Sequence, residues 1–280
     1  MELMISRILK YLNGCLDDDH MYRIGNFIIK NYTLIENHTM VSFIDAAKCS
    51  QEELLDFCQH FGIHSFDEFK ERLLADHQGR LEQIHARMLN TDINDFLEHV
   101  NTDYSKEEFI QWIDELCELI FNKQRIVILG ALYPSSVAVD FQTDLISLGK
   151  EVVEYHHFDL NFEFSDDDVV FFITATGRMM ERNVKKLKPQ NICDAYLVLI
   201  TQNLAYRDYE NVCADYFAHV LGKFDGLQFN YQIMMIFDIL RIRYYQKYYF
   251  FNFITTLSGI IIEIYSINDL GLIYLDSFFF

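Results

Sequence analysis

The sequence predicts an α/β protein with an N-terminal all-α domain, in which a helix-turn-helix bundle precedes a doubly wound parallel sheet. Three observations support this prediction. The first 124 residues show amphipathic helical patterns and hardly any strand signal. From residue 125 onward, short apolar segments alternate with helical stretches, which is the pattern of parallel βαβ units. Two of these segments end in glycine or hydroxyl residues, at the strand ends where parallel sheets bind ligands.

Capping-box patterns mark three helix starts in the N-terminal half. Each pattern supplies a hydroxyl that can accept from the third N–H of the helix and a carboxylate that can reach back to its start. The patterns begin at Ser50, Ser65 and Ser105. From Thr39 to Lys70 the sequence predicts a short helix, a tight turn, a second helix ended by Gly62, and a third helical start. This order is a helix-turn-helix pattern, and we assign it to a domain over residues 1–77.

Residues 78–124 are predicted to form a helical connector, since they contain no Gly-, Pro- or Ser-rich linker. An apolar stripe from Phe109 to Ile120 includes Trp112, and we expect it to pack against the sheet. The α/β domain is placed over residues 125–248. Its expected strands are 125–130, 151–155, one that starts at residue 169, and 195–201.

Residues 249–280 form an apolar tail for which the sequence predicts no particular structure. The uncharged run from Tyr248 to Ile262 has fifteen residues, fewer than the roughly 17–25 that span a bilayer. We therefore expect no membrane partner. The tail fits an extra strand, a segment buried in an oligomer, or a stretch without selected structure.

Composition and cysteine usage favour a globular protein of the cytoplasm. Hydrophobic residues make up 51% of the 280 residues, which is enough for two cores. The six cysteines include no C-x-x-C pair, and no secretory signal opens the chain. The one i,i+4 histidine pair, His60 and His64, is interrupted by Gly62, so we predict neither a metal site nor a cofactor.

Two loops at the predicted sheet edge carry residues suited to binding a phosphate. Thr174 and Thr176 can each offer a hydroxyl, and Gly177 allows close approach of the backbone. A predicted helix follows, whose free N-terminal N–H groups would point at the same place. The strand ending at Gly130 is followed by Ser135 and Ser136. Because parallel strands present their carboxyl ends at one edge, we expect the two loops to lie together.

This half of the chain resembles a sugar isomerase (SIS) domain. Such domains have a Gly-x-Gly-x-Ser loop after the first strand and a Ser-x-Ser-Gly-x-Thr-x-Glu loop after the third. Gly130 holds the first glycine, and Leu132 replaces the second. Thr174 and Thr176 stand where the two serines would be, Gly177 and Glu181 match, and Met179 replaces the threonine. The resemblance implies a phosphorylated sugar ligand held by the following residues: Gly130, Ser135, Ser136, Thr174, Thr176, Gly177 and Glu181.

The run from Phe57 to Lys70 is similar to the helix-turn-helix of MurR/RpiR transcriptional regulators, and the order of domains is also theirs. In that family the SIS domain senses a sugar phosphate or amino-sugar phosphate and changes DNA binding. The resemblance covers roughly residues 1–248. It implies a homo-oligomer, a dimer or tetramer, that binds duplex DNA. The implied DNA-binding residues are Lys48, Ser50, Gln51, Glu52, Glu53, Asp56, Gln59 and Lys70.

The presumed recognition helix is acidic, although a helix that approaches DNA phosphates needs nearby cations. Family members usually carry arginine at the position of Asp56 and threonine at that of Glu53. Residues 1–77 hold seven basic and thirteen acidic residues, and the whole chain has a net charge of −19. The cations that contact DNA phosphates would have to come from around the helix-turn-helix, namely Lys30, Lys48, Lys70 and Arg72.

Three functions therefore remain open. The first is a transcriptional regulator that binds DNA and senses a phosphorylated sugar or amino sugar. The second is a diverged sensor or partner protein that binds no DNA, which the acidic helix favours. The third is a phosphosugar isomerase or lyase in which Glu181, His156 or His157 moves a proton. We expect the chain not to be an enzyme, because such enzymes rarely need a helix-turn-helix.

Overall fold

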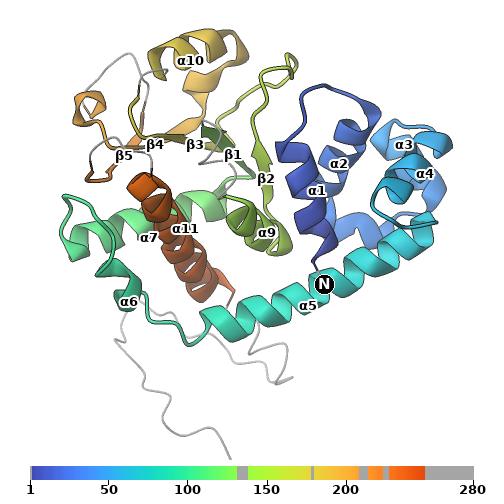
Figure 1. The fold of residues 1–280 in the computed structure, drawn as a ribbon, viewed down its shortest axis with the longest axis horizontal. Helices are drawn as coiled ribbons and strands as arrows, with labels where there is room; N and C mark the ends of the chain where they lie inside the picture. The colour runs from blue at the N-terminus through green and yellow to red at the C-terminus, as the bar shows by residue number, and fades with distance from the viewer. Residues whose placement is uncertain (1, 131–137, 178–179, 208–213, 223–226, 250–280) are drawn as a thin grey trace, which may run out of the picture.

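The computed structural model describes residues 2–130, 138–177, 180–207, 214–222 and 227–249 (Figure 1). A five-stranded parallel sheet is covered by helices on both faces, and a helical N-terminal half packs beside it. The predicted fold class is confirmed. Among the described residues, no helix combines the length and apolarity needed to cross a membrane. The apolar tail after Tyr249 lies outside the described residues.

The N-terminal half consists of helices and one 3-10 turn. They are α1 (Met4–Asn13), α2 (His20–Lys30), the 3-10 turn η1 (Tyr32–Asn37), α3 (Met40–Ala47), α4 (Gln51–His60) and α5 (Phe66–Met88). The short helix α6 (Asn94–Leu97) and α7 (Lys106–Asn122) then lead to the sheet. α5 is one continuous helix of 23 residues, so the boundary placed after residue 77 falls inside it.

Local capping explains where these helices begin. Complete capping boxes stand at Ser50 and Ser105, as the sequence predicts. Ser65 also caps its helix, but the Glu68 carboxylate accepts from the His64 N–H instead of from Ser65. α3 begins with a further box between Thr39 and Ser42, in which a serine takes the usual place of Glu or Gln.

α3 and α4 follow one another across a short turn in the region where the sequence predicts a helix-turn-helix, and their assignment as a DNA-binding motif stays a prediction. The turn between them contains Lys48 in the left-handed conformation, with φ of 53°. An aromatic cluster holds the two helices against α5. Its members, all nearly inaccessible to solvent, are Phe43, Phe57, Phe61, Phe66 and Phe69. The two helices are therefore supported by packing as well as by their caps.

The helical half packs directly on the α/β half, as Figure 1 shows for α1, α2 and α5. α1 lies along α9 (Val139–Ser147), where the Asn13 amide donates to Gln142 at 2.8 Å. The Ser6 and Thr143 hydroxyls lie 3.2 Å apart across the same contact. Buried residues of the N-terminal helices and of one sheet face belong to one contiguous core. The two halves therefore share a single hydrophobic interior.

The sheet has the strand order β2-β1-β3-β4-β5, and every pairing is parallel. The strands are β1 (Arg125–Gly130), β2 (Glu151–Glu154), β3 (Asp168–Thr174), β4 (Tyr196–Thr201) and β5 (Tyr216–His219). α10 (Met180–Leu187) covers one face, and α7, α9 and α11 (Leu227–Tyr248) cover the other (Figure 1). Three 3-10 turns, η2 (Lys188–Gln190), η3 (Ile192–Asp194) and η4 (Leu204–Tyr206), complete the described elements.

Candidate functional site

The strand order places a topological switch point between β1 and β3. After β1 the chain enters α9 on one face of the sheet, and after β3 it enters α10 on the opposite face. In open α/β sheets, the crevice at such a point, outside the carboxyl ends of the strands, is where ligands bind. Gly130 ends β1 beside Ile173, the residue before Thr174. The predicted loops thus start on either side of this crevice.

The loop after β3 is held by its own hydroxyl and by residues that follow β4. The Gly177 N–H donates to Thr174 Oγ1 at 3.1 Å. The Thr201 hydroxyl donates to the Ala175 carbonyl at 3.3 Å, and the Asn203 amide donates to the Thr176 carbonyl at 3.0 Å. Because Thr174 accepts one hydrogen bond here, its own O–H remains a donor for a ligand. The loop therefore has a defined conformation before any ligand arrives.

Gly177 has two structural reasons to be glycine. Its φ is +70°, in the left-handed region that L side chains rarely adopt. A Cβ added to it would lie 2.1 Å from Cε2 of Tyr206, whose ring fills the space beside the loop. The residue therefore permits the turn and the close approach of an aromatic ring, in addition to any approach of phosphate.

The other predicted ligand residues are described only in part. Thr174 and Thr176 are half-buried, whereas Gly130 is exposed. Ser135 and Ser136 lie outside the described residues, as does Met179. Glu181 lies in α10, and the structure describes its backbone alone. The assignment of these residues to a ligand stays a prediction.

His156 and His157 follow β2; the His156 side chain is half-buried, and the His157 side chain is exposed. The His156 ring packs against Tyr22 of α2 and Phe158, with centroid separations of 5.5 and 5.0 Å. Burial lowers the pKa of His156, and partial desolvation together with the positive charge of Lys186 lowers the pKa of His157. Through its contact with Tyr22, His156 helps to hold α2 against the sheet, a packing role that the sequence did not reveal.

The sequence analysis predicted Thr174 as a ligand residue but missed that it belongs to a row of polar residues at the carboxyl ends of three strands. Thr174, Thr201 and His219 are neighbours in the sheet register, and β5 itself was not predicted. The His219 ring is buried, with Nδ1 3.2 Å from the Asp103 carboxylate. Burial alone would raise the pKa of Asp103, but the hydrogen bond from Arg207 and the nearby His219 ring outweigh it and hold the pKa below its ordinary value. Polar side chains therefore line the carboxyl edge of the sheet from β3 across β4 to β5.

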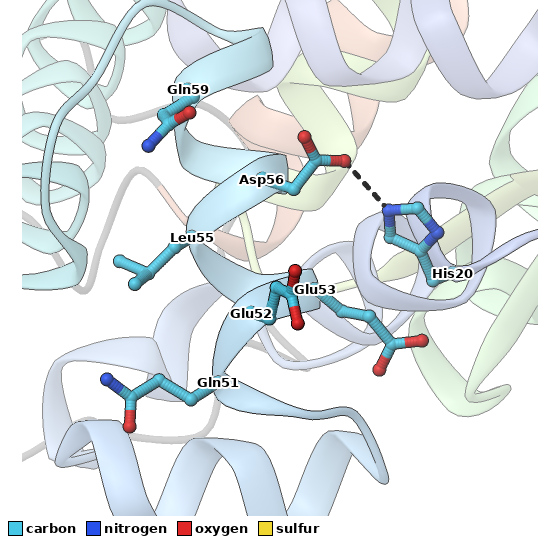
Figure 2. A pocket seen from close by; sticks show the side chains of 7 residues that line it. All are labelled: His20, Gln51, Glu52, Glu53, Leu55, Asp56 and Gln59. Carbon is cyan, nitrogen blue, oxygen red and sulfur yellow. Dashed lines mark hydrogen bonds and ion pairs between the residues drawn. The ribbon is translucent and has the colours of Figure 1, made fainter.

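The second candidate surface is the outer face of α4, shown in Figure 2. Here α4 and His20 line an open hollow of about 740 Å³. Glu52 and Glu53 contribute to it, and so does Asp56, whose carboxylate lies 3.0 Å from His20 Nε2. The Glu53 carboxylate accepts from the Ser50 N–H at 2.7 Å, and the Ser50 backbone and hydroxyl lower the pKa of Glu53. Glu53 is therefore both part of this face and part of the helix cap.

The remaining predicted DNA-binding residues differ in exposure. Gln51 and Gln59 are exposed on the same face, and Ser50 caps α4. Lys48 is exposed and joins no ion pair within the described part of the chain. Lys70 is largely buried and donates to the His38 carbonyl at 2.8 Å. Lys70 thus helps to hold the segment that precedes α3.

Comparisons with known proteins identify similar folds at low sequence identity. No family model and no curated protein matches the sequence. The Vibrio vulnificus NanR protein complexed with ManNAc-6P is 12% identical, with a TM-score of 0.42 over 91% of this chain and 96% of that one. A hypothetical protein from Methanococcus jannaschii is 19% identical, with a TM-score of 0.43 over 60% and 90%. The sugar isomerase domain of an RpiR transcription factor from Sphaerobacter thermophilus is 12% identical, with a TM-score of 0.39 over 59% and 89%.

These comparisons correct one expectation from the sequence. We expected the chain not to be an enzyme, yet the matches include the Methanococcus protein, for which a 3-hexulose-6-phosphate isomerase function is inferred. Isomerases therefore stand beside regulators among the similar structures. The domain order was the reason for excluding catalysis. We withdraw that exclusion.

Proposed function

We propose that this protein binds a phosphorylated sugar or amino sugar in the crevice between β1 and β3, and that the helical half converts binding into a regulatory output. The observation that carries the proposal is the braced loop from Thr174 to Gly177 at the topological switch point. Hydroxyl donors and a helix N-terminus suit a phosphate dianion, because both present hydrogen-bond donors to negative charge. α10 begins three residues after Gly177.

The regulatory output rests on how the two halves meet. α1 and α2 pack against α9 and β2, the elements that follow and flank β1. A ligand that changes the β1–α9 connection would therefore act on the surface that holds the helix-turn-helix. We propose duplex DNA as the target of α3 and α4, in the arrangement that helix-turn-helix proteins use.

One observation favours a second candidate, a sensor that acts on another protein. The outer face of α4 carries Glu52, Glu53 and Asp56, and α4 itself contains no lysine or arginine. DNA binding gains most of its affinity from cations that neutralise phosphates. A duplex-binding assay on the full chain at low and physiological salt separates the candidates. Submicromolar binding with a steep salt dependence supports the regulator, and its absence supports the protein-directed sensor.

Ligand binding is tested by thermal unfolding with hexose phosphates, amino-sugar phosphates and muramic acid phosphates, against the same sugars without phosphate. A ligand that binds only the folded state at a hundred times its dissociation constant adds about 2.7 kcal/mol of stability. For a chain of this size that is a rise in Tm of roughly 5–11 °C. If no phosphosugar raises the Tm more than its unphosphorylated partner does, the proposed site does not exist.

Thr176→Val tests which residues form the site, because it keeps the side-chain shape and removes the hydroxyl. The Thr176 carbonyl still accepts from Asn203 in this variant, and the unfolding temperature of the variant without ligand is the reference for its ligand-induced shift. Its ligand-induced shift should fall sharply, because the phosphate loses one donor. Thr33→Val, at an exposed position in η1, is the matched control and should leave the shift unchanged.

A further inference from the structure

A second cavity lies on the side of α9 away from the sheet, between α5 and α11. Its volume is about 150 Å³. α5, α6, α9 and α11 all contribute to its wall. The charged residues that line it are Arg80, Arg87, Asp144, Asp238 and Arg241. No residue of the β1–β3 crevice is among them.

The cavity contains more positive than negative charge. Asp144, whose side chain is 1% exposed, accepts from Arg80 Nε at 2.6 Å and from Arg241 at 2.8 Å. Arg241 also pairs with Asp238 at 2.7 Å. Arg87 is exposed, lies two turns after Arg80 on α5, and joins no ion pair within the described residues. Three guanidinium groups thus face two carboxylates, in a chain whose net charge is strongly negative.

Hydrogen-bond donors are also in excess here. Each guanidinium has five N–H groups in a planar fork that matches an oxyanion. Arg80 and Arg241 direct part of theirs to Asp144, Asp238 and the Gln83 side chain. Arg87 directs none to a carboxylate within the described residues. A bound oxyanion would accept from the remaining donors and would balance the surplus charge.

The size of the cavity limits what can enter. At about 30 Å³ for each water molecule of the liquid, 150 Å³ corresponds to roughly five waters. That space is large enough for a phosphate or a small carboxylate. Ile84 and Met88 of α5 add an apolar part to the lining.

We propose that this cavity binds a small oxyanion, a phosphate or carboxylate group, independently of the proposed phosphosugar crevice. The ion would join Arg87 of α5 to Arg241 of α11. Since α5 begins at the helix-turn-helix and ends at this cavity, an occupied site ties the position of the helical half to that of α11. The cavity is thus a second ligand site at the junction of the two halves.

The test titrates inorganic phosphate into the full chain by calorimetry and by thermal unfolding, with sodium chloride holding the ionic strength constant. Wild type should be stabilised by phosphate beyond the effect of chloride. Arg87→Gln should weaken phosphate binding at least about tenfold, because it removes charge-assisted hydrogen bonds. Arg87→Lys restores a point charge without the fork, so binding should be only partly recovered. Parallel titrations with sulfate and acetate distinguish a phosphate site from a carboxylate site.

Two controls separate this site from others. Thr176→Val alters the proposed crevice and should leave phosphate binding at Arg87 unchanged. Arg23→Gln removes an exposed arginine of α2 that pairs with Asp18, far along the chain from the cavity, and should also have no effect. Equal phosphate affinity in wild type and Arg87→Gln would overturn the proposal, and so would the absence of any phosphate effect beyond that of chloride. Loss of binding in Thr176→Val alone would assign the phosphate to the crevice instead.

Discussion

Gly177→Ala tests the structure of the loop directly, because two separate costs can be worked out for one methyl group. The φ of +70° puts alanine in the left-handed region, at about 1–2 kcal/mol. The new Cβ would also lie 2.1 Å from Cε2 of Tyr206, so the ring must move. Forcing extra volume into a packed site costs typically 1–3 kcal/mol. The expected loss of stability is therefore about 2–5 kcal/mol, or roughly 4–20 °C in Tm.

A double-mutant cycle separates the two costs. Unfolding by urea and by heat is measured for Gly177→Ala, Tyr206→Ala and the double variant. If the ring contact contributes, the double variant loses about 1–3 kcal/mol less than the sum of the single losses. The remaining penalty is the backbone strain. A loss below about 0.5 kcal/mol for Gly177→Ala, or strict additivity in the cycle, would refute the packing of Tyr206 on this loop.

Two further predictions concern the charged residues. Asp144→Asn leaves the buried Arg80 guanidinium with a neutral partner and leaves Arg241 with Asp238 as its remaining carboxylate, so we expect a loss of about 3–5 kcal/mol in urea unfolding; a loss under 1 kcal/mol would mean that the network is solvated. Exchanging Glu53 and Asp56 for threonine and arginine should raise the affinity for duplex DNA, measured by fluorescence anisotropy at low and physiological salt. Asp56→Arg alone is the control, because Glu53 also caps α4; unchanged affinity in both variants would mean that α4 does not enter a DNA groove.

The strands of the sheet could be predicted because parallel strands are buried on both faces and therefore form short, continuous apolar runs. β1 has the predicted bounds, and β2 and β4 agree with theirs within about a residue at each end. β3, for which only the start was predicted, begins one residue earlier than expected. β5 was missed because Tyr216–His219 is short and contains none of the β-branched residues that mark the four predicted strands. Its pairing with β4 depends on contacts across the sheet, which a single sequence does not display.

The candidate site could be predicted only where its residues are consecutive in the sequence. The run from Thr174 to Gly177 signals its turn by itself, since hydroxyl residues and a glycine follow an apolar strand. The residues that brace the loop, Asn203 and Tyr206 among them, follow the neighbouring strand and show no motif. The charged cavity was missed for the same reason, because Arg80 and Arg241 meet only when α5 and α11 cross α9.

The acidic character of α4 has a structural basis that bears on the choice between DNA and protein targets. Glu53 completes the helix cap, and Asp56 contacts His20 of α2, so two of the three carboxylates on this face also hold the local structure. The nearby cations are similarly engaged, with Lys70 bound to the His38 carbonyl and Arg72 paired with Asp76. Lys48, in the turn before α4, is exposed and joins no ion pair in the described part of the chain. Lys48 is the exposed cation nearest to α4 in the sequence, so at low salt the affinity of the α4 face for DNA should depend on Lys48 more than on any base contact.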